Sequence, residues 1–577
     1  MKSWYRKLFR ITGWISSYDR SHISGDLKAG LTTGIMLIPQ GMAYAVIAGV
    51  PPIYGLYAGV VPLLIYPIFG TSRHLSIGPV AVDMLIVAAG ISVVSVSGNF
   101  DLVGLVILIT MMTGIIQLLM GAFRLGSLLN IFSRPVITGF IMAAPIIIAF
   151  TQIENLFGVQ LNGSQNVIIL LKDFSNVISE IHNPTMYWGL SAIIFLIALN
   201  RLTPKLPVSM ILLCLSITVA WFIDIENMDV EITGNIPEGL PPFSFPLLNY
   251  EIFQELLPTA ITLALVQFMT ITSLGKVFAK RHGYLIDSNQ ELTSVGASNF
   301  IGSFFSSLPV SGSFSRSAAA EQANAKTPLT NIFTALVIIT TLLFLTPVFY
   351  YLPMPVLAGI IIVSVFGLID LKEIEFLLKT KKSEGGIAIF TFLSTILIGI
   401  QEGILLGVGA SMLLMLYKAS RPSVAELGVL PNTRSFKNIE RNPDAKRIEG
   451  ILILRIDASF SFINAEFFRD FILEKSEEQD KKTRYVIIDG SSINLLDTTA
   501  IDALISIIKT LRNWNMDLYL AGLKGPVRDI IEKSGFEKHL GSDHFCRTPH
   551  MAVKKILEMM DREDNGGRSE KYQDISL

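Results

Sequence analysis

Long apolar runs separated by short polar connectors fill the chain from about Leu31 to Leu416. Runs of this kind are typical of helices that cross roughly 30 Å of hydrocarbon. The pattern predicts fourteen such spans, two of which begin irregularly. They lie near residues 29–48, 52–69, 79–97, 102–122, 135–153, 185–200, 207–223, 256–275, 288–305, 313–324, 328–346, 355–370, 386–401 and 403–418. After Arg434 the sequence becomes charged, which indicates a soluble domain.

This change of pattern predicts five parts of the chain. They are a cytoplasmic N-terminal segment (1–28), a transmembrane domain (29–420), a linker (421–434), a soluble domain (435–562) and a polar tail (563–577). Alternate connectors between the spans carry Lys and Arg, as at Arg73 and Arg124, whereas the stretch from Asp224 to Glu255 is acidic. This alternation predicts that both termini lie in the cytoplasm. The basic, aromatic N-terminus has no apolar core and no cleavage site, so we expect no cleaved signal peptide.

Composition excludes several classes of function. The net charge of −1 gives no indication of a nucleic-acid partner. The two cysteines, Cys214 and Cys546, lie far apart and indicate neither a disulfide framework nor a metal site. The sequence also has no glycine-rich phosphate loop and no cluster of metal ligands, so we expect neither enzymatic activity nor a cofactor.

Two apolar spans are interrupted at matching places in the two halves of the chain. Gly78-Pro79 opens the third span, and Pro309, 230 residues after Pro79, precedes the tenth. Gln40 in the first span and Gln267 in the eighth are polar residues 227 positions apart. Such paired interruptions predict an inverted-repeat transporter with its site near the middle of the membrane. The alternative is that Gly and Pro only kink two membrane helices.

A helix that starts inside the membrane leaves its first N–H groups without partners. Its aligned peptide dipoles add roughly half a positive charge at that end. Two such starts facing each other form a pocket suited to an anion. Arg316 adds a charge that is costly to bury, so it should face a pocket or a partner, the alternative being a structural pair with Glu321. Hydroxyls that can cap these helices or bind an oxyanion belong to Ser311, Ser313, Ser315 and Ser317.

Three motifs resemble the SulP family of anion transporters. They are "LIPQGMAYAVIAGVPPIYGLYAG" (37–59), "PIYGLYAGVVPLLIYPIFGTSR" (52–73) and "GSFSRSA" (312–318). The resemblance implies a polytopic α-helical membrane protein with two inverted seven-helix repeats, a core and a gate domain, and elevator-type movement of the core. It further implies that the anion sits between half-helices 3 and 10. The implied substrate-binding residues are Gln40, Tyr44, Pro79, Val80, Ala81, Ser313, Phe314, Ser315 and Arg316.

One position departs from the family pattern. Many coupled members resemble "GFxES" in helix 8, with a carboxylate where the stretch "VQFMTITS" (266–273) has Thr270. A threonine cannot accept a transported proton, although its hydroxyl can help to bind sodium. Asp83, one turn into half-helix 3, is a carboxylate near the same pocket and a candidate for coupling to Na⁺ or H⁺. The alternative is that Asp83 is a hydrogen-bonded structural acid.

The soluble part alternates strands and helices, which is typical of a sheet flanked by helices. "RYVIIDGSSINLLDTTAIDALISIIKTLRNWNMDLYLAGLKGPVRDIIEKSGF" (484–536) resembles a cytoplasmic α/β STAS domain. In relatives of that domain the turn matching Asp497, Thr498 and Thr499 carries a phosphorylated hydroxyl, which falls on Thr499. The interpretation that we favour is a helix N-cap.

The sequence therefore predicts a secondary active transporter of a small inorganic anion in the inner (plasma) membrane. The prevalence of sulfate in the family favours sulfate, and the resemblance implies a homodimer. Bicarbonate or chloride exchange is the alternative within the class. An uncoupled anion channel and a membrane sensor that signals through the STAS domain are alternatives from other classes.

Overall fold

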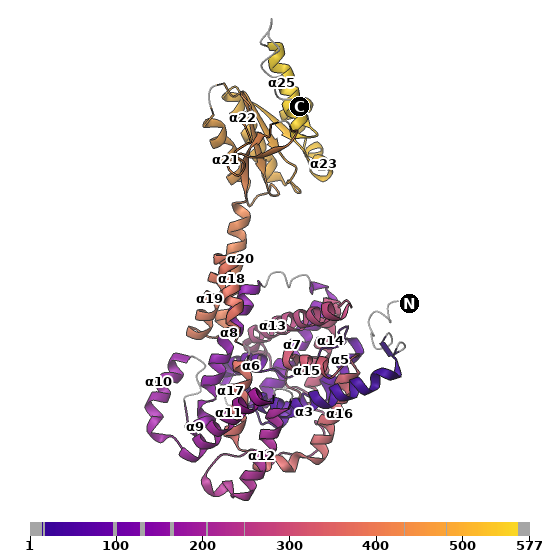
Figure 1. Ribbon diagram of the computed structural model, residues 1–577, viewed down its shortest axis with the longest axis vertical. Coiled ribbons are helices and arrows are strands. Elements are labelled where there is room, and N and C mark those ends of the chain that lie inside the picture. The colour runs from indigo at the N-terminus through magenta and orange to yellow at the C-terminus, as the bar shows by residue number, and fades with distance from the viewer. Residues whose placement is uncertain are drawn as a thin grey trace. The chain divides into compact units, whose positions relative to one another are not determined.

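The computed structural model describes residues 14–15, 18–95, 101–126, 133–161, 167–203, 206–246, 249–367, 369–431, 433–479 and 482–563. It forms two compact units, one up to Ser411 and one from Met412 onward, and each is described by itself (Figure 1). The predicted tail lies outside the described residues except for Glu563, as does most of the N-terminal segment before Tyr18.

Each of the fourteen predicted spans coincides with a helix or a pair of short helices. In chain order these are α3 (Ile23–Ile47), α4 and α5 (Ile53–Tyr57 and Val61–Phe69), α6 (Ala81–Ser95), α7 (Leu102–Ala122), α8 (Arg134–Thr151), α11 (Asn183–Leu202), α12 (Val208–Phe222), α13 (Tyr250–His282), α14 (Ser288–Ser303), α15 (Phe314–Gln322), α16 (Leu329–Phe344), α17 (Met354–Phe366), α19 (Lys382–Leu397) and α20 (Ile400–Ser420). Within the described residues, 7 helices are long and apolar enough to cross a membrane, and shorter apolar helices cover other spans. Three helices between the spans were not predicted: α9 (Ile153–Phe157), α10 (Val167–Val177) and α18 (Leu371–Thr380).

The helices of the first unit pack in two groups. One group contains α3 to α7 and α13 to α16, and the other contains α8, α11, α12, α17 and α19. The contacts repeat between the two halves of the chain. Helix α3 packs on α15 and α16 as α13 packs on α6 and α7, and α8 packs on α19 as α17 packs on α11. This correspondence is what two seven-helix repeats produce, and the predicted fold is confirmed.

Two short strands join the half-helices at their starts. β1 (Ile77–Gly78) pairs antiparallel with β2 (Ser311–Gly312), with Ile77 opposite Gly312 and Gly78 opposite Ser311. Pro79 and Pro309 keep the residues before them extended, so the chain enters each half-helix from a strand rather than from a preceding helical turn. Gly78 has φ +149°, and a Cβ there would lie 2.9 Å from Nη2 of Arg316, so only glycine fits.

The second unit is a six-stranded sheet in the order β4-β3-β5-β6-β7-β8. Its strands are β3 (Val424–Val429), β4 (Phe436–Asn438), β5 (Ile451–Ile456), β6 (Tyr485–Asp489), β7 (Asp517–Ala521) and β8 (Phe545–Cys546). Its helices are α21 (Ala465–Glu477), α22 (Thr498–Asn513), α23 (Gly525–Ser534), α24 (Glu537–Leu540) and α25 (Pro549–Glu563). Strands β5 to β8 are parallel, whereas β3 runs antiparallel to β5.

Both faces of this sheet are covered. Leu452 and Leu454 of β5 pack in a core with α21 and α22, while Ile451 and Ile453 pack in a second core with α25. The segment 421–434, predicted as a linker, contains strand β3 of the same sheet. The sequence did not indicate this strand because one of its pairing partners, β4, is only a short strand, and the other, β5, lies more than twenty residues further along the chain.

Candidate functional site

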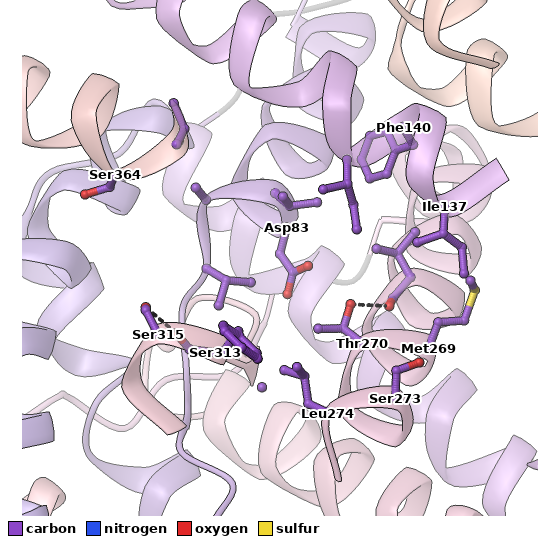
Figure 2. Close-up of a pocket in the computed structure, with 18 of the residues that line it drawn as sticks. Asp83, Ile137, Phe140, Met269, Thr270, Ser273, Leu274, Ser313, Ser315 and Ser364 are labelled. Atoms are coloured by element: carbon purple, nitrogen blue, oxygen red, sulfur yellow. Dashed lines mark hydrogen bonds between the residues drawn. The ribbon is translucent and has the colours of Figure 1, made fainter. Parts of the chain in front are cut away.

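A cavity of about 530 Å³ lies between the two helix groups of the first unit, at the starts of both half-helices (Figure 2). From the first group it is lined by Gln40, Tyr44, Val80, Ala81, Val82, Asp83, Val266, Met269, Thr270, Ser273, Leu274, Gly312, Ser313, Phe314 and Ser315. From the second group and α20 it is lined by Val136, Ile137, Phe140, Ile141, Ser364, Val365 and Ile404. One wall therefore offers hydroxyls, an amide and a carboxylate, whereas the other is mostly apolar.

The sequence identified most of the polar wall. Seven of the nine predicted substrate-binding residues line the cavity, and the other two, Pro79 and Arg316, do not. Both candidates for ion coupling, Asp83 and Thr270, line the same cavity as the half-helix starts. The mostly apolar wall from α8 and α17 was not foreseen, because its residues look like those of any membrane helix.

Arg316 lies behind the cavity and connects the two half-helices. Its side chain is fully buried; Nη1 donates to Oε1 of Gln40 at 3.0 Å and Nη2 donates to the carbonyl of Pro79 at 3.1 Å. Its Nε, also buried, has no hydrogen-bond partner among the described residues. The alternative partner, Glu321, instead contacts Arg281 Nη1 at 3.1 Å and His282 Nε2 at 2.7 Å. All hydrogen-bond partners of the guanidinium in the described structure are thus neutral.

The serines of the tenth segment have different tasks. Ser313 is the N-cap of α15, and its hydroxyl accepts from the backbone N–H of Arg316 at 3.4 Å. Ser315 faces the cavity, with its hydroxyl 3.3 Å from that of Ser313. The hydroxyl of Ser317 accepts a hydrogen bond from the N–H of Ser76 at 2.9 Å. Because Ser76 immediately precedes β1, this bond links β1 to α15. The hydroxyls of Ser313 and Ser315 therefore belong to the cavity, next to the positive end of the α15 dipole.

Asp83 points its carboxylate into the cavity from the first turn of α6 (Figure 2). Its Oδ2 accepts from Nε2 of Gln267 on α13 at 2.9 Å. Thr270, one turn further along α13, donates its hydroxyl to its own helix at the carbonyl of Val266. Because that donation uses the hydroxyl hydrogen, the lone pairs of Thr270 remain for a cation in the cavity.

The residues proposed for regulation lie in the second unit. Asp497 is the N-cap of α22; its carboxylate accepts from the N–H of Ala500 at 2.9 Å and of Phe462 at 2.7 Å. Thr498 and Thr499 begin the helix, and both are exposed. The capping geometry gives this turn a structural task, and phosphorylation of Thr499 stays a prediction.

Family comparison agrees with this geometry. Residues 23–391 match the model described as the sulfate permease family, and residues 442–552 match the STAS domain. The chain belongs to the sulfate permease family. It is 34% identical over 575 residues to sulfate transporter 4.1, chloroplastic, of Arabidopsis thaliana, covering 96% of this chain and 83% of that relative. It is 30% identical over 537 residues to a probable sulfate transporter of Mycobacterium tuberculosis, covering 93% of this chain and 96% of the relative.

Solved structures show the same fold for this family member. The murine solute carrier 26 family member A9 anion transporter in the inward-facing state matches with TM-score 0.90 and 23% identity, over 97% of this chain and 95% of that one. The transmembrane domain of a cyanobacterium bicarbonate transporter matches with TM-score 0.59 and 20% identity, over 68% of this chain and 98% of that one. At these identities the likeness concerns the fold alone.

Proposed function

We propose that this protein carries a small inorganic oxyanion, sulfate, across the membrane by secondary active transport. The observation that carries the proposal is the fully buried guanidinium of Arg316, which has only neutral hydrogen-bond partners in the described structure. A buried charge without a counter-charge is costly. An anion in the adjacent cavity supplies that counter-charge, and the start of α15 adds the positive end of a helix dipole.

The choice of sulfate rests on the relatives. Relatives that share at least 30% identity over most of the chain include proteins named as sulfate transporters. A sulfate ion has four oxygens that accept hydrogen bonds, and the hydroxyls of Ser313 and Ser315 and the side chains of Gln40 and Tyr44 line the cavity that would hold it.

The proposed movement is of the elevator type. The cavity lies between two helix groups, and its polar wall comes from the first group, whereas most of the opposite wall is apolar. An apolar wall offers few hydrogen bonds that would have to break when the first group slides past it. The polar residues and the bound anion can therefore travel together as one body.

Coupling to a cation is assigned to Asp83, with Thr270 beside it. Both line the cavity, and a carboxylate close to a bound anion repels it electrostatically. A proton or sodium ion at Asp83 removes that repulsion, so cation and anion favour each other's binding. In the cell we place the protein in the plasma membrane, as a homodimer with both termini in the cytoplasm, as the distribution of Lys and Arg predicts.

Uptake of labelled sulfate, bicarbonate and chloride into proteoliposomes tests the proposal. We expect saturable sulfate uptake that accumulates against its gradient when an inward proton or sodium gradient is imposed. Preference for bicarbonate or chloride over sulfate would contradict the substrate. A steady anion conductance without accumulation would show a channel and contradict the transport mechanism.

A further inference from the structure

Gln267 lies at the centre of a buried cluster of amides behind the cavity. Its side chain is fully buried on α13, and its Nε2 donates to Asp83. Its Oε1 accepts two hydrogen bonds, from Nε2 of Gln117 on α7 at 2.8 Å and from Nδ2 of Asn299 on α14 at 2.9 Å. Asn299 also donates to Oε1 of Gln117 at 3.0 Å. Four helices of the first group therefore meet in one set of hydrogen bonds.

A backbone group fixes the direction of these hydrogen bonds. The N–H of Val310, just before β2 and half-helix α15, donates to Oδ1 of Asn299 at 2.8 Å. Because a backbone N–H can only donate, the Asn299 oxygen must face Val310 and its NH₂ must face Gln267. Gln267 then presents its oxygen to Asn299 and its NH₂ to Asp83. The Oδ2 atom of Asp83 is thereby always an acceptor, whatever occupies the cavity side of the carboxylate.

We propose that Gln267 is a positioning residue of the transport cycle. It holds the Asp83 carboxylate at the cavity and connects it, through Asn299, to the backbone at Val310 that leads through β2 into half-helix α15. This inference rests on the proposed coupling role of Asp83 and deepens it. A hydrogen bond to an ionised carboxylate is stronger than one to a neutral acid. Protonation of Asp83 therefore weakens its hydrogen bond from Gln267, and a sodium ion, which leaves the carboxylate ionised, weakens it less by drawing charge toward the cavity. Either change alters how Gln267 bonds to Asn299 and so affects the backbone that leads into the anion site.

The cluster also provides a matched control. Gln117 and Gln267 are both buried glutamines that are bonded to each other, and each accepts a hydrogen bond from Asn299, but of the two Gln267 alone contacts Asp83. Gln117→Leu removes one partner of the cluster and leaves the bond from Gln267 to Asp83. Gln267→Leu removes that bond as well as the link to Asn299.

The experiment compares wild type, Q267L, Q117L and D83N as full chains in proteoliposomes. It measures labelled sulfate accumulation driven by an inward cation gradient and, separately, sulfate exchange at equal concentrations without a gradient. We expect Q267L to lower the ratio of accumulation to exchange by about tenfold, which corresponds to one lost hydrogen bond to a charged group. Q117L should keep the wild-type ratio. Q267N keeps an amide on a shorter side chain, so its ratio should lie between those of Q267L and Q117L. It replaces Q267L in the comparison if Q267L does not fold.

The outcomes separate this inference from the function on which it rests. If D83N loses accumulation while Q267L or Q267N keeps the wild-type ratio, Gln267 is only a packing residue and the inference is overturned. If Q117L lowers the ratio of accumulation to exchange as strongly as Q267L does, then coupling depends on the intact cluster rather than on the contact with Asp83, and the inference is again overturned. If D83N keeps full accumulation, the coupling role of Asp83 itself fails.

Discussion

The two half-helices of the membrane domain carry opposite charges that are held in similar ways. Arg316 on α15, in the second repeat, is bonded by Gln40 from the first helix of the first repeat. Asp83 on α6, in the first repeat, is bonded by Gln267 from the first helix of the second repeat. The difference lies in what each charge faces. Arg316 is turned to the carbonyl of Pro79 behind the cavity, whereas Asp83 lines the cavity itself.

This difference indicates a division of labour. In the transport mechanism proposed above, a guanidinium bonded to the backbone just before the opposite half-helix is a fixed charge that sets the geometry and potential of the anion site. A carboxylate with one oxygen held by an amide and access to the cavity can exchange a cation during each cycle. Substitutions at the two half-helices should therefore change different quantities: anion affinity on one side and the response to a cation gradient on the other.

The largest effect is expected from Arg316→Ala. It removes the buried positive charge and both of its hydrogen bonds, so sulfate affinity should fall by about 100-fold or more. Arg316→Lys keeps the charge without the planar fork and should be intermediate. Sulfate binding to purified protein by calorimetry measures both variants. Wild-type affinity in the alanine variant would contradict the assignment of the anion site.

Asp83→Asn should remove the response to a cation gradient. The asparagine oxygen can still accept from Gln267, so the shape of the site is kept while the charge is lost. We expect gradient-driven accumulation of sulfate to disappear. Exchange of internal for external sulfate in preloaded vesicles should remain largely intact. Measurement of both in one preparation serves as the internal control, and loss of exchange as well would show that Asp83 is needed for the fold or for anion binding.

Gln40→Leu tests the counterpart of Gln267 in the other repeat. It removes one neutral partner of Arg316 and leaves the bond to Pro79, so sulfate affinity should fall by about tenfold. The ratio of accumulation to exchange should stay at the wild-type value. A change in that ratio without a change in affinity would contradict the assignment of anion affinity to one half-helix and cation coupling to the other.

The smallest effect is expected from Thr270→Val. Among the described residues the hydroxyl donates to the carbonyl of Val266 in its own helix, so its removal leaves the packing of α13 in place. The concentration of sulfate at half-maximal uptake should change by no more than about twofold, far less than the tenfold that 1.4 kcal/mol produces. Uptake titrated with sulfate measures this, and a tenfold shift would mean that Thr270 contacts the anion directly.

Much of the fold could be predicted from the sequence because helices that cross the bilayer must be long and apolar, as 7 of the described helices are. The paired breaks at Pro79 and Pro309 indicated the half-helices, since a proline ends a preceding helical turn locally. The partners of the charges could not be predicted in the same way. Gln40 lies 276 residues from Arg316 along the chain, and such pairs depend on the packing of helices rather than on any local pattern.

The amide cluster is a second feature that the sequence did not predict. Gln267 was noticed as a polar residue in an apolar span, but Gln117 and Asn299 gave no signal of their own because each is one amide among ordinary helical residues. Strand β3 was missed for a related reason, since six residues with little alternation become a strand through their pairing with β4 and with the distant β5. In each case the information lies in a contact between distant segments.

The most direct test of the division of labour is a crossed measurement on Arg316→Lys and Asp83→Asn in proteoliposomes of identical composition. Both variants are assayed for sulfate affinity and for the ratio of gradient-driven accumulation to exchange. We predict that Arg316→Lys weakens affinity and keeps the ratio. When the coupling cation is saturating, so that wild-type Asp83 no longer repels the anion, Asp83→Asn keeps an affinity close to that of wild type, and it abolishes gradient-driven accumulation. If both variants change the same quantity, the two half-helices do not have separate roles, and the account is contradicted.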